Sequence, residues 1–307
     1  WIYRYDGSAF QRDHGPKNAN RASLTGTSRT NVWIVGSGGH AERFDGTVWT
    51  DQPLASKENL FGAAAIAPDG VAAIREGSGS PSAGRVVSFA AGAWSEEVLN
   101  IGPQMGVTDL AAESKGKVLA RVYDWASYST YTLEKQSGAW GVTGVDDDPG
   151  LALLFDGPVL HGVAYEYSPG GSFRRSNVYQ RSSLGWVSLW SVPEYVTSVW
   201  SDGADTFVAT VDHIYRRTQT GWEIALTLPG IRWEAIAGSS GSDVWAISYG
   251  SPKRRVLYHF DGQFWDEVER GALNPREAYR ALPTQLFVTP TDVWVMSMGG
   301  TLLHKAR

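Results

Sequence analysis

Three irregular stretches of the chain hold the side chains that are best suited to recognise a ligand. They are VYDWASYSTY at 122–131, AYEYSPGGSFRR at 164–175 and SYGSPKRR at 248–255. Aromatic rings can pack against a sugar or a protein, and the planar guanidinium of arginine pairs well with carboxylates. The predicted ligand-binding residues are Trp125, Tyr128, Tyr165, Tyr167, Arg174, Arg175 and Arg254.

We expect these stretches to be expanded connections between strands, because connections on a rigid scaffold often carry function. The connection that contains Glu194 and Tyr195 is expected to add to the same face of the molecule. Such connections can also be plain hairpins with solvated tips, and the sequence leaves both interpretations open.

The same residue types raise the question of a glycoside-cleaving enzyme. Such an enzyme would combine arginines that bind a carboxylate, a tyrosine nucleophile with a glutamate partner, and an acid/base aspartate. Tyr165, Glu166 and Arg174 supply the residue types, but no spacing marks them as a set. The sequence has no nucleophile elbow, P-loop or HExxH motif, and its six histidines show no metal-binding spacing. We therefore predict no catalytic residues, no metal and no cofactor.

A repeated turn motif indicates the scaffold that must position these residues. IYRYDGSAF at 2–10, ERFDGTVW at 42–49 and YHFDGQFW at 258–265 each place an aromatic residue three positions after an Asp-Gly pair. Asp-Gly between alternating apolar runs predicts a hairpin, because glycine readily adopts the positive φ that the turn requires.

Weaker copies of this motif retain the glycine and the aromatic residue, so that the aromatic residue recurs at intervals of 36 to 46 residues. The series consists of Phe10, Trp49, Trp94, Trp140, Trp186, Trp222 and Trp265. A residue that recurs once per repeat usually packs between adjacent sheets. We therefore predict that these aromatic residues, and also Trp33, Trp245 and Trp294, are structural and do not serve as sugar platforms.

A second motif completes the repeating unit. NVWIVG at 31–36, DVWAIS at 243–248 and DVWVMS at 292–297 share a polar residue, Val and Trp, followed by alternation. Each unit then reads as four short strands over about 45 residues, which is typical of a propeller blade. The sequence predicts an all-β fold over 1–307 as a single domain. It is a seven-bladed β-propeller of four-stranded antiparallel blades, closed by pairing the N- and C-terminal strands in one blade.

Composition excludes several classes of partner. The formal net charge of -5 is too small to indicate nucleic acid or an anionic membrane as a partner. No stretch has the length of apolar sequence that a membrane span needs. The chain contains no cysteine, which excludes disulfides and thiolate metal sites.

The Asp-Gly hairpins resemble degenerate Asp-box hairpins of bacterial BNR-repeat propellers. The match is partial, because Arg4, Arg43 and His259 stand where the Asp-box has Ser or Thr, and because Asp directly precedes Gly. Proteins of this kind include lectins, sialidases and scaffolds, so the fold by itself does not choose a function. The resemblance implies a secreted or cell-surface protein, placing the chain in an extracellular, periplasmic or surface location.

Taken together, these features predict a non-catalytic binding propeller that recognises a glycan or a protein partner on its loop-rich face. Two alternatives stay open at this point, a sialidase-like enzyme and a purely structural spacer domain. The identity of the ligand and the oligomeric state do not follow from the sequence.

Overall fold

The chain is described by a computed structural model that covers residues 2–5, 10–14, 21–76, 85–113, 117–136, 139–142, 150–250, 254–268, 283–297 and 302–306. Within these ranges the structure is almost entirely β-strand, and η1 (Ser37–Gly39) is a short 3-10 turn. The chain divides into two compact units. One consists of Thr25–Tyr195, and the other consists of Trp1–Leu24 with Val196–Arg307.

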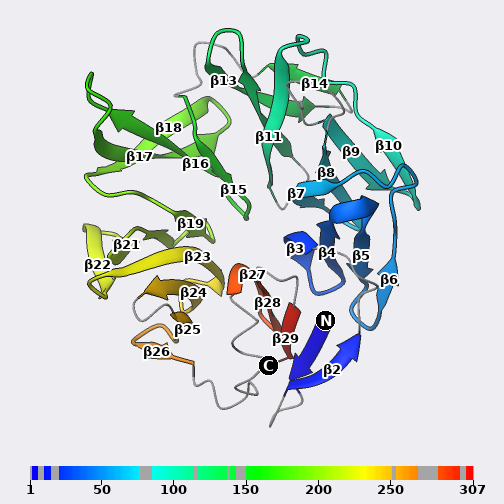
Figure 1. The fold of residues 1–307 in the computed structure, drawn as a ribbon. Coiled ribbons are helices and arrows are strands. Elements are labelled where there is room, and N and C mark those ends of the chain that lie inside the picture. The colour runs from blue at the N-terminus through cyan, green and yellow to red at the C-terminus, as the bar shows by residue number, and fades with distance from the viewer. Residues whose placement is uncertain are drawn as a thin grey trace. The chain divides into compact units, whose positions relative to one another are not determined.

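The Thr25–Tyr195 unit holds four antiparallel sheets, except for residues 21–24 at the start of the first one. Their strands pair in chain order, and we number them blades one to four (Figure 1). Blades one and two contain β3 (Arg21–Ser28), β4 (Asn31–Gly36), β5 (Ala41–Phe44), β6 (Trp49–Asp51), β7 (Leu60–Ile66), β8 (Gly70–Arg75), β9 (Arg85–Ala90) and β10 (Ala93–Glu96). Blades three and four contain β11 (Met105–Ala112), β12 (Val118–Asp124), β13 (Ser129–Gln136), β14 (Ala139–Val142), β15 (Leu153–Phe155), β16 (His161–Tyr167), β17 (Phe173–Ser182) and β18 (Gly185–Val192).

The second unit holds blades five to seven. Blades five and six contain β19 (Ser198–Ser201), β20 (Thr206–Ala209), β21 (His213–Thr218), β22 (Gly221–Thr227), β23 (Ile231–Ser240), β24 (Asp243–Gly250), β25 (Arg254–Phe260) and β26 (Trp265–Glu267). Blade seven contains β27 (Pro283–Thr289), β28 (Asp292–Ser297), β29 (Leu302–Ala306), β1 (Ile2–Tyr5) and β2 (Phe10–His14). The seven sheets define a seven-bladed β-propeller, as the repeats predicted.

Blade seven joins the two ends of the chain. β1 pairs with β29 in parallel, while β2 pairs antiparallel with β1 (Figure 1). The predicted pairing of the terminal strands is confirmed, with one addition. Both ends of the chain supply a third strand, so this sheet has five strands where the other six have four. The pairing covers a sheet edge that would otherwise be open to another chain.

The second strand of a blade forms the core. Every residue of β4 and of β28 is buried. The outermost strands β6 and β10 are largely exposed. A short apolar run that is buried on both faces is typical of a strand enclosed by other sheets. Trp33 on β4, for example, contacts Phe89 and Trp94 of blade two, with ring centroids 5.0 and 6.4 Å apart.

The polar residue at the start of the polar-Val-Trp motif has a structural role in blade seven. Asp292 is fully buried and accepts a hydrogen bond from Nε2 of His304 at 2.7 Å. The His304 ring stacks on Trp294, with centroids 4.6 Å apart and planes inclined by 3°. A buried carboxylate needs such partners, because burial of an unpaired charge is costly. The aspartate, the tryptophan and the histidine therefore form one packed group.

Blade six repeats this group and blade one varies it. In blade six, Asp243 accepts hydrogen bonds from His259 at 2.9 Å and from the indole of Trp245 at 3.2 Å. In blade one, Asn31 accepts the indole N–H of Trp33 at 2.7 Å. The motif that recurs in the sequence thus secures the second strand to the third, and its regularity reflects packing.

The Asp-Gly turns at Gly46 and Gly262 are built as expected, and the turn at Asp6-Gly7 lies outside the described residues. Gly46 has a φ of 102°, and the carboxylate of Asp45 accepts the backbone N–H groups of Thr47 and Val48 at 2.8 and 2.9 Å. These backbone hydrogen bonds hold the pKa of Asp45 below its usual value, and the same geometry lowers the pKa of Asp261. The side chain therefore stabilises the turn that glycine makes possible.

The repeat tryptophans pack as predicted. Trp140 is buried, and the others are half-buried, namely Trp49, Trp94, Trp186, Trp222 and Trp265. The indole of Trp94 donates to the backbone carbonyl of Gln52 at 2.7 Å, and the guanidinium of Arg181 lies over Trp186. The side chain of Phe10 lies outside the described residues. Trp94, Trp140 and Trp265 contact the neighbouring blade, as their predicted structural role requires.

Replacing Asp292 by alanine should destabilise the protein by about 3 kcal/mol, because it leaves the buried His304 without its carboxylate. Chemical denaturation followed by tryptophan fluorescence measures this loss. Asp266→Ala is the matched control, since Asp266 is exposed on β26 and should change stability by no more than about 0.5 kcal/mol. Equal effects of the two substitutions would contradict the structural role of Asp292.

Candidate functional site

Most of the predicted site residues lie on two hairpins, in blades three and four. The connections within these hairpins are short, although we expected expanded ones. In blade three, the connection between β12 and β13 is only the four residues 125–128. In blade four, Tyr165 and Tyr167 belong to β16, and the connection to β17 is the five residues 168–172. The expectation of expanded loops was therefore wrong. In blade four, Tyr165 and Tyr167 follow the alternation of β16, whereas Trp125 and Tyr128 lie in the short connection of blade three.

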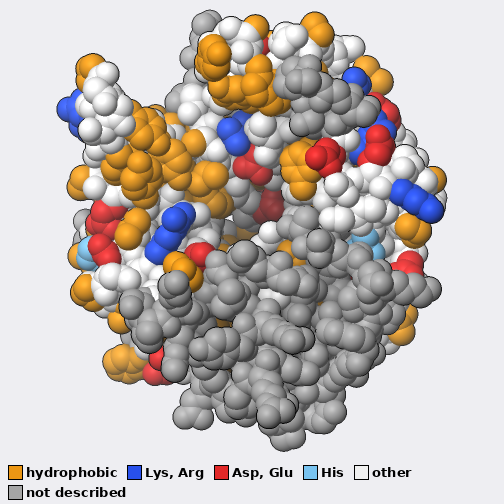
Figure 2. All heavy atoms as spheres, in the orientation of Figure 1, with side chains coloured by type: hydrophobic (Ala, Val, Ile, Leu, Met, Phe, Trp, Pro, Cys, Tyr) orange, Lys and Arg blue, Asp and Glu red, His pale blue; other side chains and the backbone are white. Residues whose placement is uncertain are grey.

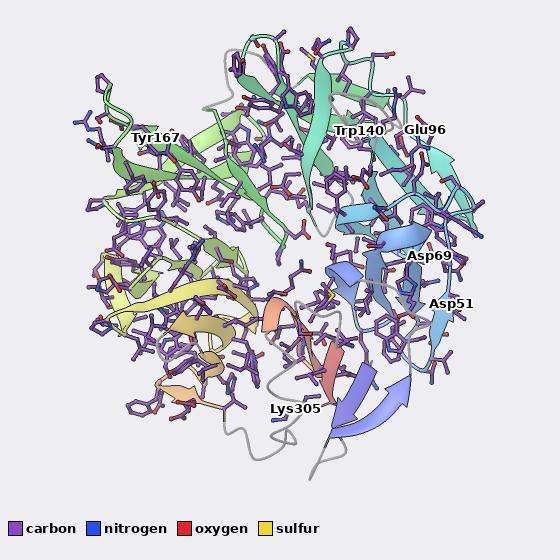
Figure 3. The ribbon with its side chains drawn as sticks, in the orientation of Figure 1. Asp51, Asp69, Glu96, Trp140, Tyr167 and Lys305 are labelled. Carbon is purple, nitrogen blue, oxygen red and sulfur yellow. The ribbon has the colours of Figure 1, made fainter. Side chains whose placement is uncertain are left out.

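In blade four, four aromatic side chains form one cluster. The rings of Phe173 and Tyr195 stack at 3.7 Å with planes inclined by 20°. Tyr165 contacts both of them edge-on, at 6.4 and 5.5 Å, and Tyr167 contacts Phe173 at 6.1 Å. Hydrophobic side chains gather over this part of blade four in Figure 2, and Figure 3 shows Tyr167 on the hairpin. We call these four residues the aromatic cluster.

The connection between blade four and the next strand completes the cluster. Tyr195 lies in this connection, which is tied to β17 by a 2.6 Å hydrogen bond from Ser176 Oγ to the carbonyl of Glu194. A hydrogen bond between the hydroxyls of Tyr195 and Tyr167 raises the pKa of Tyr195. Tyr167 and Tyr195 keep 49% and 39% of their surface exposed, so the cluster is ordered and accessible at the same time.

The charged residues of this hairpin lie on its other face. Glu166 stands between Tyr165 and Tyr167, and neighbouring side chains of a strand point to opposite faces. Its carboxylate accepts a hydrogen bond from Arg174 at 3.1 Å and forms an ion pair with Arg175, also at 3.1 Å. The structure thus brings Tyr165 and Tyr167 together in the cluster. It places Arg174 and Arg175 together in a separate ion pair with Glu166.

Blade three presents its aromatic residues through a tight turn. Trp125 is half-buried, and its ring contacts Tyr123 edge-on at 5.4 Å. Asp124 accepts the backbone N–H of Ala126 at 2.8 Å. Tyr128 is 79% exposed and has a φ of 57°. A bulky residue in this left-handed region is strained, and glycine would be the favoured occupant.

Arg254, the remaining predicted site residue, begins β25 in the other compact unit. Its side chain lies outside the described residues. The ring contacts of Trp125 and those of Tyr167 are each made within their own blade or its adjoining connection. The predicted set is therefore distributed over three blades, and the aromatic cluster is its most compact part.

Sequence reasoning missed a pair of acidic residues, Asp109 and Asp156. Asp156 follows β15 and accepts the backbone N–H of Ala112 at 2.8 Å. Asp109 on β11 accepts the backbone N–H of Leu154 at 3.0 Å. Desolvation raises the pKa of both carboxyl groups. The nearby charge of Asp109 adds to this effect at Asp156, whose pKa rises to about 7. Asp156 belongs to an Asp-Gly pair, and no sequence signal separates it from the turn aspartates.

Within the described ranges, no group of three or more acidic, histidine or cysteine side chains could hold a metal ion. No helix of these ranges is long and apolar enough to span a membrane.

Comparisons with known proteins support the fold. A chain of YCF48 bound to D1 peptide is 15% identical, covers 99% of this chain and 97% of its own, and gives a TM-score of 0.68. PorZ of Porphyromonas gingivalis, a surface component of the type-IX secretion system, is 12% identical with a TM-score of 0.62. The extracellular domain of the one-component system BT4673 from B. thetaiotaomicron is 11% identical with a TM-score of 0.62.

These similarities establish the propeller fold and no more. The match to PorZ includes 97% of this chain and 48% of the PorZ chain. The match to BT4673 includes 94% of this chain and 38% of the BT4673 chain, so this chain spans less than half of either. No family model matches the sequence, and no curated protein matches it.

Replacing Tyr128 by glycine should leave thermal stability unchanged or raise it by up to about 1 kcal/mol. The substitution removes left-handed strain, although glycine adds entropy to the unfolded chain. Gly46→Ala is the inverse control, because its new Cβ would lie 2.9 Å from Thr30 Cγ2 at a φ of +102° and should destabilise the fold. If Tyr128→Gly destabilised as much as Gly46→Ala, the tyrosine ring would be a packing element.

Proposed function

We propose that this protein is a non-catalytic propeller that binds a protein or peptide ligand through the aromatic cluster of blade four. The observation that carries this proposal is the ordered group of Tyr165, Tyr167, Phe173 and Tyr195, two members of which are exposed. Aromatic side chains with polar tips are enriched among the residues that dominate protein interfaces. The structural similarity to YCF48 bound to D1 peptide supports the choice of a peptide ligand.

The arrangement of the rings favours a protein ligand over a glycan. Phe173 and Tyr195 each cover one face of the other ring, and Tyr165 and Tyr167 contact them edge-on. The cluster therefore presents inclined ring edges and hydroxyl groups more than a single flat platform. Inclined edges and hydroxyls fit the mixed apolar and hydrogen-bonding surface of a peptide.

The geometry of the hairpin also supports a non-catalytic role. A glycoside-cleaving site would need tyrosine, glutamate and arginine to converge on one sugar. Tyr165 and Glu166 are consecutive in β16 and point to opposite faces. Both carboxylate oxygens of Glu166 are engaged by arginines. Glu166 thus acts as an ion-pair partner within the hairpin.

We place the protein outside the cytoplasm as part of this proposal. Two structures of similar fold support this location, an extracellular domain and a bacterial surface component. The resemblance of the Asp-Gly hairpins to Asp-box hairpins of bacterial propellers also supports this location.

Tyr167→Ala should weaken peptide binding at least tenfold, because an exposed aromatic anchor at an interface often contributes about 2 kcal/mol or more. The measurement is parallel screening of the intact protein on a peptide library and a glycan array, followed by titration of the best peptide. Phe264→Ala is the matched control, since Phe264 is 67% exposed in blade six and its loss should leave affinity unchanged. Glycan binding without peptide binding would contradict the proposal, as would full affinity in Tyr167→Ala.

The protein should show no turnover on a panel of fluorogenic glycosides, because Tyr165 and Glu166 point to opposite faces of β16 and do not face a common substrate. Initial rates at several pH values, with a sialidase as positive control, test this expectation. Turnover that disappeared in Glu166→Gln would overturn the non-catalytic assignment.

A further inference from the structure

The first strands of blades three and four are joined by reciprocal hydrogen bonds from backbone to side chain. Asp109 on β11 accepts the N–H of Leu154 on β15 at 3.0 Å. Asp156, directly after β15, accepts the N–H of Ala112 on β11 at 2.8 Å. The N–H of Gly157 also donates to the carbonyl of Ala112 at 3.3 Å. We call this pair of aspartates with their amide donors the acidic clasp.

A threonine from blade one extends the clasp. The hydroxyl of Thr25 on β3 donates to Asp156 at 3.3 Å and accepts the N–H of Ala65 on β7 at 3.1 Å. The hydrogen bonds therefore connect the first strands of blades one, two, three and four. A group that bonds to several separate strands influences how firmly those strands are held together.

The charges around Asp156 come from several elements. Asp109 approaches from β11, and Glu113 directly follows that strand, where it pairs with Gly157. Arg121 on β12 acts on Asp109 and partly offsets its charge. On β16, the buried His161 stands opposite Phe155 and is bonded through Nδ1 to a backbone carbonyl. β3 and β7 contribute the Thr25 hydroxyl and the Ala65 amide, which are uncharged.

We propose that the acidic clasp is a pH-sensitive junction, which is tightest in acid and loses strength as the pH rises to neutrality. In acid, Asp156 is neutral and keeps its bonds to Ala112 and Thr25 without repelling Asp109. Near neutrality both carboxyl groups are charged, and like charges that share a site repel each other.

The direction of the effect follows from proton binding. The pKa of Asp156 is about 7 in the folded protein, against a usual value of 3.8. Between these values the folded state holds a proton that the unfolded state has released, so stability falls as the pH rises. The contribution is complete below about pH 4 and absent above about pH 7. Asp156 remains exposed to solvent, so water screens part of the repulsion and limits the size of the effect.

The test compares the thermal midpoints of the wild type and Asp156→Asn between pH 4.5 and 8. Asparagine keeps the acceptor for Ala112 and stays uncharged, so the wild type should lose roughly 3 °C relative to the variant over this range. Asp202→Asn is the matched control, because Asp202 belongs to the same kind of Asp-Gly pair but bonds within its own turn and to Gly241. A pH dependence in this control as large as that of Asp156→Asn would show that the effect does not come from the clasp. A constant difference for Asp156→Asn would overturn the proposal.

Two further measurements cover the case in which Asp156→Asn folds poorly. In the wild type, hydrogen-exchange protection of the Ala112, Leu154 and Gly157 amides should fall with pH relative to amides of β18, after correction for intrinsic exchange. In Asp109→Asn, the loss should move to lower pH, because the neighbouring charge is gone. Protection that stays parallel to that of β18, or a window that Asp109→Asn leaves in place, would overturn the proposal.

Discussion

Burial of the second strand of each blade is the constraint on which much of the structure depends. A strand with both faces enclosed must be apolar along its length, and its polar ends must find partners inside the protein. β28 meets this requirement with the buried Asp292, which His304 and the stacked Trp294 accompany. β4 meets it with Asn31 and Trp33. The recurrence of polar-Val-Trp is therefore the signature of a packing solution.

Because packing occupies the regular positions, the capacity to bind a ligand lies in what differs between blades. The hairpin of β16 and β17 in blade four is one such difference, because its strands carry Tyr165, Tyr167 and Phe173. Because side chains alternate along a strand, Tyr165 and Tyr167 lie on one face of β16 and Glu166 lies on the other. The ion pair of Glu166 with the two arginines lies on the face away from the aromatic cluster, where it is exposed to solvent and contributes little to stability.

The features that could be predicted are those that depend on short-range geometry. An Asp-Gly turn needs a positive φ, and its aspartate accepts backbone N–H groups of the same turn. The turn at Asp45 and Gly46 could therefore be predicted from these two residues alone. The connection between β12 and β13 was harder to predict. VYDWASYSTY resembles an irregular loop, yet most of it continues two paired strands, because aromatic residues suit a strand that is open to solvent. The fifth strand of blade seven could not be predicted either. Each end of the chain offers a third strand, and the sequence does not show that the blade uses both.

Three Asp-Gly pairs that follow a first strand show where sequence stops being informative. Asp69 is exposed in its turn (Figure 3), and Asp202 accepts backbone N–H groups of its own turn and of Gly241. Asp156 instead accepts the N–H of Ala112 from another blade and lies near a second carboxylate. The sequence by itself determined the number of blades, the turns and the structural tryptophans, because these follow from local conformation and a repeated packing unit. Only the tertiary structure decided which aspartates and aromatic residues meet, because their neighbours come from strands that are distant in the chain.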